Sequence, residues 1–313
     1  MKQPSVGQKT TIIASSDIAL VKYWGKKDPI LRLPENGSVS MILSGLDTTT
    51  TVEFQNNLSE DDITIQGESE EGESGRVKKH LQRIREIAKI PTYAKVVSVN
   101  NFPKATGLSS SGSGFAALTI AATKAAGLSL SEKELSILAR QGSGTACRCV
   151  CGGFVEWQDG TTSESSFAIS RFPYSHWDIR DVVAVVSEDK KMISSTEGHE
   201  SAQSSPFFQN RQQHIKNKIS DTLTYIEKKD FTKLGELVET EALEFHSILF
   251  TSVPSLILWH PGTVEVMHAV RSLRNNGVPA YFTINTGFNV HVLTLPEFEE
   301  RVKKKLNSLS LVR

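Results

Sequence analysis

The alternation of apolar and polar residues predicts a first half of the chain that is rich in strands and a second half that contains both helices and strands. Short segments with alternating or β-branched residues are typical of strands. We predict strands over residues 11–14, 39–43, 49–54, 95–99, 152–157, 182–187, 281–284 and 290–295. Apolar residues three or four positions apart predict helices, as at Val77, Leu81 and Ile84. The predicted helices span residues 77–90, 114–127, 131–140, 210–228, 231–247, 263–275 and 297–306.

This order of elements predicts an α+β protein with two units. The first half is rich in strands, and helices alternate with strands in the second half, which favours two fused α+β units with a cleft between them. We place the units at residues 1–180 and 181–313, and a chain of 313 residues can bury a sizeable core.

Composition excludes some classes of protein. Lysine plus arginine and aspartate plus glutamate both number 35, and this zero net charge argues against nucleic-acid binding. No segment approaches the ~20 apolar residues of a membrane span, and the polar start is no signal peptide, so we expect a cytoplasmic protein. The three cysteines, at 147, 149 and 151, cannot form a disulfide framework. We expect small buried strand residues that bind no metal.

The loop over residues 100–118 carries the strongest chemical signal. Between Ala105 and Gly114 it holds three glycines and five serines or threonines. Backbone N–H groups of such a turn, and the positive end of the next helix dipole, bind phosphate oxygens. Ser113 stands where a P-loop has its lysine, and the dinucleotide and serine-hydrolase patterns are incomplete. The loop therefore favours a phosphate site over an ordinary serine-rich connection.

Two further segments place cations beside flexible glycines. Residues 22–26 read Lys-Tyr-Trp-Gly-Lys, which is as typical of a surface strand with snorkelling side chains as of a site. In residues 142–148, Ser143, Thr145 and Arg148 flank a tight turn, and a planar guanidinium suits phosphate. Taken alone, this segment is equally well explained as an ordinary turn with a surface arginine.

Together the three segments resemble the mevalonate diphosphate decarboxylases of the GHMP kinase superfamily. The matching motifs are Lys22-Tyr-Trp-Gly-Lys26, Asn101-Phe-Pro, Gly107-Leu, Ser110-Ser111, Gly114-Phe-Ala-Ala-Leu118, Ala139-Arg, Gly142-Ser-Gly, Ala146-Cys-Arg148 and Gly152-Gly-Phe-Val-Glu-Trp157. Later pieces agree: Ser194-Ser-Thr196, Gly198, Ser205-Pro206, Phe245-His246, Gly287 and Asn289. The resemblance thus covers nearly the whole chain.

The resemblance implies both a fold and a reaction. The fold is that of GHMP kinases, with an N-terminal unit like ribosomal protein S5 and a ferredoxin-like C-terminal unit. The reaction uses ATP and Mg²⁺ to phosphorylate the 3-hydroxyl of mevalonate 5-diphosphate, and loss of phosphate and CO₂ then gives isopentenyl diphosphate. ATP is consumed because hydroxide is a poor leaving group and phosphate a good one. The resemblance also implies a homodimer.

The resemblance assigns roles to individual residues. Lys22 is expected beside the 3-hydroxyl, where a fixed cation stabilises developing charge. The 5-diphosphate of the substrate is assigned to Tyr23, Lys26, Ser143, Thr145 and Arg148. ATP is assigned to Ser98, Asn101, Gly107, Ser109, Ser110, Ser111, Gly112 and Ser113. Ser111 is also the candidate ligand of Mg²⁺, and no other protein ligand of the metal is expected.

The chain departs from the family pattern at two positions that matter. The family has Asp in its Asp-x-Gly-x-Asn element, where this chain has Asn285, and Asn in its Asn-Ile-Ala element, where this chain has Asp17. That family aspartate is assigned to deprotonating or orienting the 3-hydroxyl, and an amide cannot accept a proton. We hypothesise one exchange, with Asp17 and Asn285 facing each other beside Lys22. The alternative is a solvated Asp17 and a lost base. We expect His199, where the family has Met, to pack rather than react.

We distinguish three functions on these grounds. The first is the ATP-dependent decarboxylase of mevalonate 5-diphosphate. The second is a relative with altered chemistry: a mevalonate 3-kinase, or a decarboxylase of the 5-monophosphate or the 3,5-bisphosphate. The third is a binding protein that has lost catalysis. The complete set of phosphate-binding residues favours a phosphorylated substrate over free mevalonate.

Overall fold

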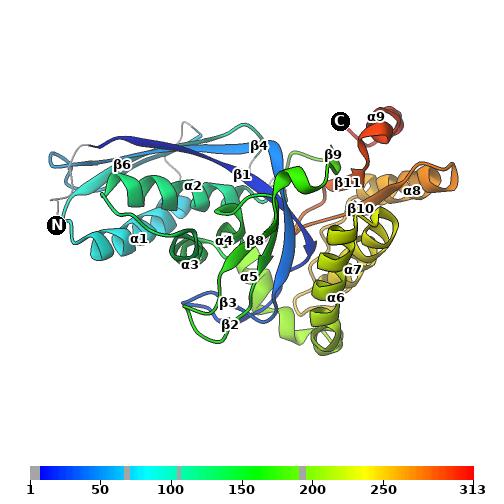
Figure 1. Ribbon diagram of the computed structural model, residues 1–313, viewed down its shortest axis with the longest axis horizontal. Coiled ribbons are helices and arrows are strands. Elements are labelled where there is room, and N and C mark those ends of the chain that lie inside the picture. Colours follow the sequence, from blue (N-terminus) through cyan, green and yellow to red (C-terminus); the bar gives the residue numbers. More distant parts are fainter. Residues whose placement is uncertain (1–7, 67–70, 104–106, 190–194) are drawn as a thin grey trace.

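The described chain is built around two long antiparallel strands, β1 (Thr10–Val21) and β4 (Ser38–Gln55). The computed structural model describes residues 8–66, 71–103, 107–189 and 195–313. Figure 1 shows the helices of the two halves at opposite ends of these long strands. Helices and strands are mixed along both halves of the chain, so the predicted α+β class is confirmed.

β4 is the central strand of the larger sheet. The strand order is β5-β6-β4-β7-β8, and β1 also pairs with β4. β6 pairs with the second part of β4, and β7 pairs with its first residues. The remaining strands of this sheet are β5 (Asp62–Ile65), β6 (Tyr93–Asn100), β7 (Phe154–Trp157) and β8 (Ala168–Phe172). A separate hairpin consists of β2 (Lys26–Asp28) and β3 (Leu33–Pro34).

The strands that we predicted at 39–43 and 49–54 are one strand, β4. Ser15 of β1 pairs with Asp47, whereas Asp17 already pairs with Ile42, so the residues of β4 between these partners bulge. Gly45 lies in this bulge with φ +93°, a backbone conformation that favours glycine. The bulge at residues 43–46 interrupts the pairing without ending the strand, and Asp17 follows the irregularity directly.

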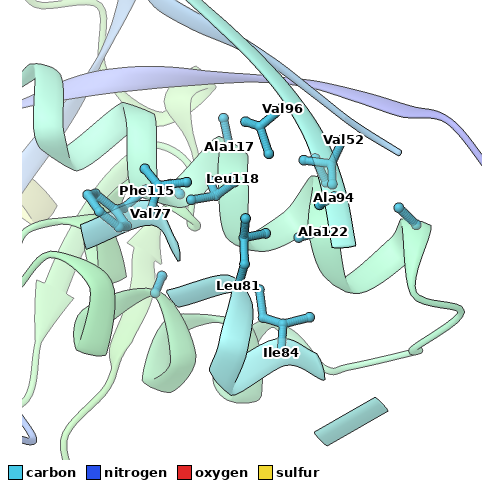
Figure 2. Close-up of a cluster of buried hydrophobic side chains, with 14 of the residues drawn as sticks. Val52, Val77, Leu81, Ile84, Ala94, Val96, Phe115, Ala117, Leu118 and Ala122 are labelled. Carbon is cyan, nitrogen blue, oxygen red and sulfur yellow. The ribbon is translucent and has the colours of Figure 1, made fainter. Parts of the chain in front are cut away.

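Helices α1 (Glu71–Ala88), α2 (Ser110–Ala125) and α3 (Glu132–Gly142) lie along one side of the long strands (Figure 1). Figure 2 shows Leu81 and Ile84 of α1 in the same cluster as Leu118 of α2 and Val96 of the sheet. The residues whose spacing predicted α1 are thus its buried face, and burial of apolar surface is the main stabilising contribution here. α3 begins at the predicted capping box of Ser131 and Glu134.

α2 begins four residues before the predicted start, at Ser110. Serine and glycine are poor helix formers, which is why the sequence suggested a loop. The small residues instead allow close packing, since a Cβ on Gly112 would lie 3.1 Å from both Thr145 Oγ1 and Cys149 Sγ. Tertiary contact therefore overrides local propensity in the first turn of α2.

The prediction that the cysteines lie in a strand is wrong. Cys147 and Cys149 belong to the four-residue helix α4 (Ala146–Cys149), and Cys151 follows it. All three thiols are buried and free, as expected, and the described residues contain no cluster that could hold a metal ion. All four residues of α4 are buried, so the pattern of apolar and polar residues could not distinguish a helix from a strand there.

The second unit is a small antiparallel sheet covered by helices. Its strand order is β10-β11-β9, from β9 (Arg180–Ala184), β10 (Ala280–Thr283) and β11 (Val290–Thr294). The helices are α5 (Ser195–Glu200), α6 (Phe208–Lys228), α7 (Phe231–Thr251), α8 (Pro261–Asn275) and α9 (Glu299–Leu306). Short 3₁₀ turns span Tyr174–His176, Ala202–Ser204 and Pro296–Phe298. The predicted helices and strands of this half are all present.

The two units share a hydrophobic core. Ile18 and Leu20 of β1 pack in one cluster with Ile215 of α6 and Leu234 of α7. This shared core places the last residues of β1 against the second unit, where a site at the junction can draw on both. Among the described residues, no helix is both long and apolar enough to cross a membrane.

Candidate active site

The start of α2 meets the second unit at a pair of glycines. Gly107 has φ +92°, and a Cβ added there would lie 2.8 Å from Gly287 Cα. The backbone of Ser109, at the N-terminus of α2, also has a left-handed conformation with φ +58°, and the Ser109 side chain forms no capping hydrogen bond with the helix. The first turn of α2 carries no acidic residue. The free N–H groups at this helix end can therefore donate hydrogen bonds to phosphate oxygens, as predicted for this loop.

The serines of this loop have different surroundings. Ser110 and Ser111 line a pocket beside α2, and Ser143 Oγ donates to Ser111 Oγ at 3.3 Å. Ser113 is fully buried and shares a hydrogen bond with Thr48 Oγ1 at 2.6 Å, so it ties α2 to β4 instead of facing a ligand. Ala105 and Thr106 of the loop, like Ser194 of a later motif, lie outside the described residues.

The pocket beside α2 has an apolar wall and a polar rim. Its apolar residues come from α1, α2 and the sheet: Ile65, Val77, Val96, Phe115 and Leu118. Thr50, Ser98, Asn100, Ser110 and Ser111 supply its hydroxyl and amide groups. A flat aromatic base with polar edges fits such a surface.

Of the two residues predicted near the nucleoside, only Ser98 lines this pocket. The Asn101 side chain accepts from Asp47 N at 2.8 Å and donates to Gly45 O at 3.1 Å, so both its polar groups hold the bulge of β4. Its neighbour Asn100 lines the pocket instead. A one-residue shift at a strand end moves a side chain to the other face, and spacing alone did not resolve whether Asn100 or Asn101 faces the pocket.

Lys22 lies directly after β1, and only 3% of its surface is exposed. Its Nζ donates to Ala19 O, to Thr283 Oγ1 at 2.6 Å and to Asn285 Oδ1 at 3.4 Å. Burial is the largest cause that lowers the pKa of Lys22, to about 7. Lys22 thus lies at the junction of the two units, next to the second-unit residues Thr283 and Asn285.

Asp17 is buried and forms a two-point contact with Arg148. Its Oδ2 accepts from Arg148 Nε and Nη2, both at 2.7 Å, and neither side chain is more than 3% exposed. Its Oδ1 accepts from Ser109 Oγ at 2.8 Å. Asp17 therefore joins the predicted phosphate loop to the predicted substrate arginine, and it is not a solvated turn residue.

Asp17 and Asn285 lie in one cluster with Lys22, as the exchange hypothesis requires. The Asn285 amide donates to the backbone carbonyl of Asp17 at 3.5 Å and accepts from Lys22. The carboxylate of Asp17 nevertheless faces Arg148 and Ser109. The cluster keeps one carboxylate, and that carboxylate contacts Arg148 instead of Lys22.

The turn after α3 forms a second polar wall. Tyr23 is 7% exposed, and its hydroxyl is buried without a hydrogen-bond partner in the part of the chain that the structure describes. A Cβ on Gly144 would lie 3.2 Å from this hydroxyl, so the Tyr23 hydroxyl faces the turn that carries Ser143 and Thr145. A buried hydroxyl without a partner is costly, and a ligand oxygen would satisfy it.

Two arginines beside this turn were missed by sequence reasoning. Arg32 Nε donates to Gln141 O at 3.3 Å, and Arg76 Nη2 donates to Gly142 O at 3.2 Å. Burial, followed by the charges of Arg32 and Arg76, lowers the pKa of Lys26 to about 8. These three half-buried cations come from a hairpin and from α1 and lie near one another at the end of α3, and nothing in their separate segments indicated that they would meet.

His199 packs as expected. Its ring lies between those of Tyr23 and Trp24, with centroids 4.3 and 4.2 Å away, and its Nδ1 accepts from Gly25 N at 3.0 Å. The histidine thus holds the Lys-Tyr-Trp-Gly-Lys segment in place.

Glu241 and Arg211, both fully buried, hold the backbone of Lys22. Glu241 Oε1 accepts from Lys22 N at 2.8 Å and from Arg211 Nη2 at 2.6 Å, and Arg211 also donates to Lys22 O at 2.8 Å. Two helices of the second unit therefore fix the end of β1 through charged hydrogen bonds. No sequence motif indicated this support.

The chain matches family models over both halves. A model of the diphosphomevalonate decarboxylase-like N-terminal domain matches residues 14–168, and one of the mevalonate 5-diphosphate decarboxylase C-terminal domain matches residues 181–311. The chain is 35% identical over 310 residues to the diphosphomevalonate decarboxylase of Debaryomyces hansenii, covering 92% of this chain and 80% of the relative. It is 34% identical over 299 residues to the phosphomevalonate decarboxylase of Haloferax volcanii, covering 95% of this chain and 91% of that relative.

A solved structure supports the same assignment. The structure of MDDEF in complex with MVAPP, AMPPCP and magnesium has a TM-score of 0.91 to this chain at 38% identity. The similarity covers 96% of this chain and 94% of that chain.

Proposed function

Because the chain belongs to the diphosphomevalonate decarboxylase family, we propose that it catalyses the ATP-dependent decarboxylation of mevalonate 5-diphosphate. The products are isopentenyl diphosphate, CO₂, ADP and phosphate. The reaction uses ATP and Mg²⁺, in keeping with the AMPPCP and magnesium bound in the related structure. It serves the mevalonate route to isoprenoids.

One observation carries this proposal: a single hydrogen-bonded chain joins the two halves of the site. Ser109 at the start of α2 donates to Asp17, which in turn pairs with Arg148. Arg148 also donates to Ser38 Oγ at 2.7 Å, so its guanidinium is engaged within the protein. The nucleotide loop and Arg148 of α4 therefore hold each other at fixed positions, with Lys22 beside them. Such an arrangement suits phosphoryl transfer, in which catalysis consists mainly of positioning and charge stabilisation.

We assign ATP to the open N-terminus of α2 and the adjoining pocket. Gly107, Ser109 and Gly112 shape the loop, and Ser110 and Ser111 present hydroxyls to the phosphates, with Ser111 as the Mg²⁺ candidate. Ser98 faces the nucleoside side of the same pocket. We do not assign ligand contacts to Ser113 and Asn101, whose polar groups are engaged within the protein.

We assign the substrate phosphates to the wall beside Tyr23. Its buried hydroxyl, the hydroxyls of Ser143 and Thr145, and the cation of Lys26 were expected there, and Arg32 joins them. A diphosphate has more anionic oxygens than a monophosphate, and several cations around one turn suit the larger charge. This grouping favours the 5-diphosphate over the 5-monophosphate.

Product analysis tests the function directly. The protein is incubated with ATP, Mg²⁺ and, separately, mevalonate, its 5-phosphate, its 5-diphosphate and its 3,5-bisphosphate, and ADP and CO₂ are measured. The proposal predicts equal ADP and CO₂ from the 5-diphosphate. ADP without CO₂ indicates a 3-kinase, CO₂ without ADP a bisphosphate decarboxylase, and neither product a binding protein.

We also propose a division between residues 180 and 181, a homodimer and a cytoplasmic location. The ends of the two matched family regions, at residues 168 and 181, support the division. Light scattering during size-exclusion chromatography measures the oligomeric state, and a mass of one chain would contradict the dimer. Fractionation of the source cells tests the location.

A further inference from the structure

Lys22 is a buried cation whose ammonium meets only neutral acceptors. Its Nζ donates to a backbone carbonyl, to the hydroxyl of Thr283 and to the amide of Asn285. No carboxylate oxygen of the described residues lies within ion-pair distance of Nζ. A buried ammonium without a counter-ion is costly and tends to give up its proton.

The charged groups that surround Lys22 are already paired with one another. On the side of β1 and α4, Asp17 pairs with Arg148. On the side of α6 and α7, Glu241 pairs with Arg211, and it accepts from the Lys22 backbone N–H and not from Nζ.

Two further titratable groups complete the surroundings. Lys218 also pairs with Glu241, at 3.3 Å, which adds a positive charge on the α6 side. His246 of α7 contacts the carbonyl of Asn285, and burial lowers the pKa of this histidine to about 3, so it stays neutral.

The combined effect of these groups on the pKa of Lys22 is consistent with an ammonium that has no ion-pair partner. Burial is the largest cause and lowers the pKa of Lys22 to about 7. Glu241 and Asp17 raise it, whereas Arg148 and Arg211 lower it, so the nearby charges largely offset one another. A lysine in this state can exchange its proton near neutral pH, as lysines that act as bases do.

We propose that neutral Lys22 accepts the proton of the substrate 3-hydroxyl as that hydroxyl is phosphorylated. The proposal rests on the function proposed above. Two of the three directions around Nζ point at close acceptors, Ala19 O and Thr283 Oγ1. The third points at the amide of Asn285, at the longer distance of 3.4 Å. The Asn285 contact, the longest of the three, exists only in the ammonium form. In the neutral amine two N–H groups keep the close contacts, the contact with Asn285 is lost, and the lone pair is left to accept from the substrate hydroxyl.

The step balances in atoms and charge. The hydroxyl O–H bond breaks and an N–H bond forms on Lys22, while the oxygen bonds to the γ-phosphorus and the bond from that phosphorus to ADP breaks. Lys22 is then an ammonium ion beside the new phosphate ester. It stabilises the phosphate that leaves with CO₂ and afterwards returns its proton to water or to that phosphate. Asn285, which cannot accept a proton, orients the hydroxyl.

The protonation state of Lys22 can be measured without turnover. In the full chain labelled with [ε-¹³C]lysine, the signal that disappears in Lys22→Arg is followed from pH 5.5 to 10 by NMR. We expect a midpoint near 7, and a signal that stays protonated above pH 9 overturns the proposal. Lys27→Arg, an exposed neighbour, is the control and leaves the signal in place.

Kinetics supply the second test. We expect kcat/KM for ADP release to fall below the NMR midpoint with the same apparent pKa. An arginine keeps the charge but cannot accept a proton, so Lys22→Arg should lose ~10²–10⁴-fold in turnover. Isothermal titration calorimetry should show its affinity for the 5-diphosphate changed by less than about tenfold. An acid limb near pH 4, or an arginine variant with more than a tenth of wild-type turnover, refutes the base. If the wild type yields no product from any mevalonate phosphate, the proposed function fails, whereas the NMR midpoint still decides the state of Lys22.

Discussion

Replacing Asp17 with Asn tests whether the Asp17–Arg148 pair holds the site together. The two side chains are 0% and 3% exposed and meet at 2.7 Å, so solvent screens them little. In the wild type Arg148 and Ser109 bind different carboxylate oxygens of Asp17. The asparagine of the variant has a single side-chain oxygen, which can accept from only one of these two sides. Removing one partner of a buried ion pair costs about 3–5 kcal/mol, because the other charge is left uncompensated. We expect a loss of that size in the free energy of unfolding, and the loss of turnover.

The assay needs a control that separates stability from catalysis. Asp61 and Arg85 form a second buried pair at 2.7 Å, with side chains 3% and 8% exposed, in the first unit and outside the proposed site. Urea denaturation followed by tryptophan fluorescence measures the free energy of unfolding, and ADP release measures turnover. Asp61→Asn should lose comparable stability but keep its turnover. An Asp17→Asn variant within 1 kcal/mol of wild type, or with unchanged turnover, refutes the reasoning.

Three further predictions concern Arg32, His80 and Gly107. Arg32→Gln should weaken binding of the 5-diphosphate roughly 10- to 100-fold, the value of one charged hydrogen bond, and weaken binding of the 5-monophosphate less; equal losses in calorimetry contradict it. Burial lowers the pKa of His80 from 6.5 to about 3, so below pH 6.5 the unfolded chain binds a proton that the folded chain does not. The free energy of unfolding therefore decreases as the pH is lowered from 6.5 towards 3, by up to about 1.4 kcal/mol per pH unit. His80→Gln should make urea denaturation less pH-dependent between pH 6.5 and 5, whereas the exposed His214→Gln should not. Gly107→Ala forces φ +92° on alanine and brings its Cβ within 2.8 Å of the opposite backbone, so fluorescent ATP analogues should bind more weakly. Gly152→Ala, with open space around it and outside the ATP pocket, should bind them normally.

Long periodic helices could be predicted well from the sequence. Helices α6 and α7 were expected at residues 210–228 and 231–247 and are found at Phe208–Lys228 and Phe231–Thr251. Their apolar spacing reports burial against one neighbour, which is a local property of the sequence. The first turn of α2 and the short α4 were missed because their small residues reflect close packing, which only the neighbouring elements explain.

The candidate site shows the same division. The motif residues Lys22, Ser109 and Arg148 were identified because their segments together resemble one family; taken alone, the segments of Lys22 and Arg148 were equally well explained as ordinary structure. The contacts among them were not predictable, since Asp17 and Arg148 are 131 residues apart in the chain. The hypothesis that Asp17 takes the place of the missing base correctly placed Asp17 near Asn285 and Lys22. It did not predict that the carboxylate would face Arg148 and Ser109.

The sequence by itself determined the composition of this protein's chemistry: a serine-glycine loop for phosphate, a lysine and an arginine for charge, and Asn285 at a position where a proton acceptor is expected. Tertiary structure alone decided how these groups are paired. It turned Asp17 toward Arg148, left Lys22 among neutral acceptors and brought Arg32 beside Tyr23. The physical reason is that charge and protonation depend on distances and burial, and these arise only when distant strands and helices pack together.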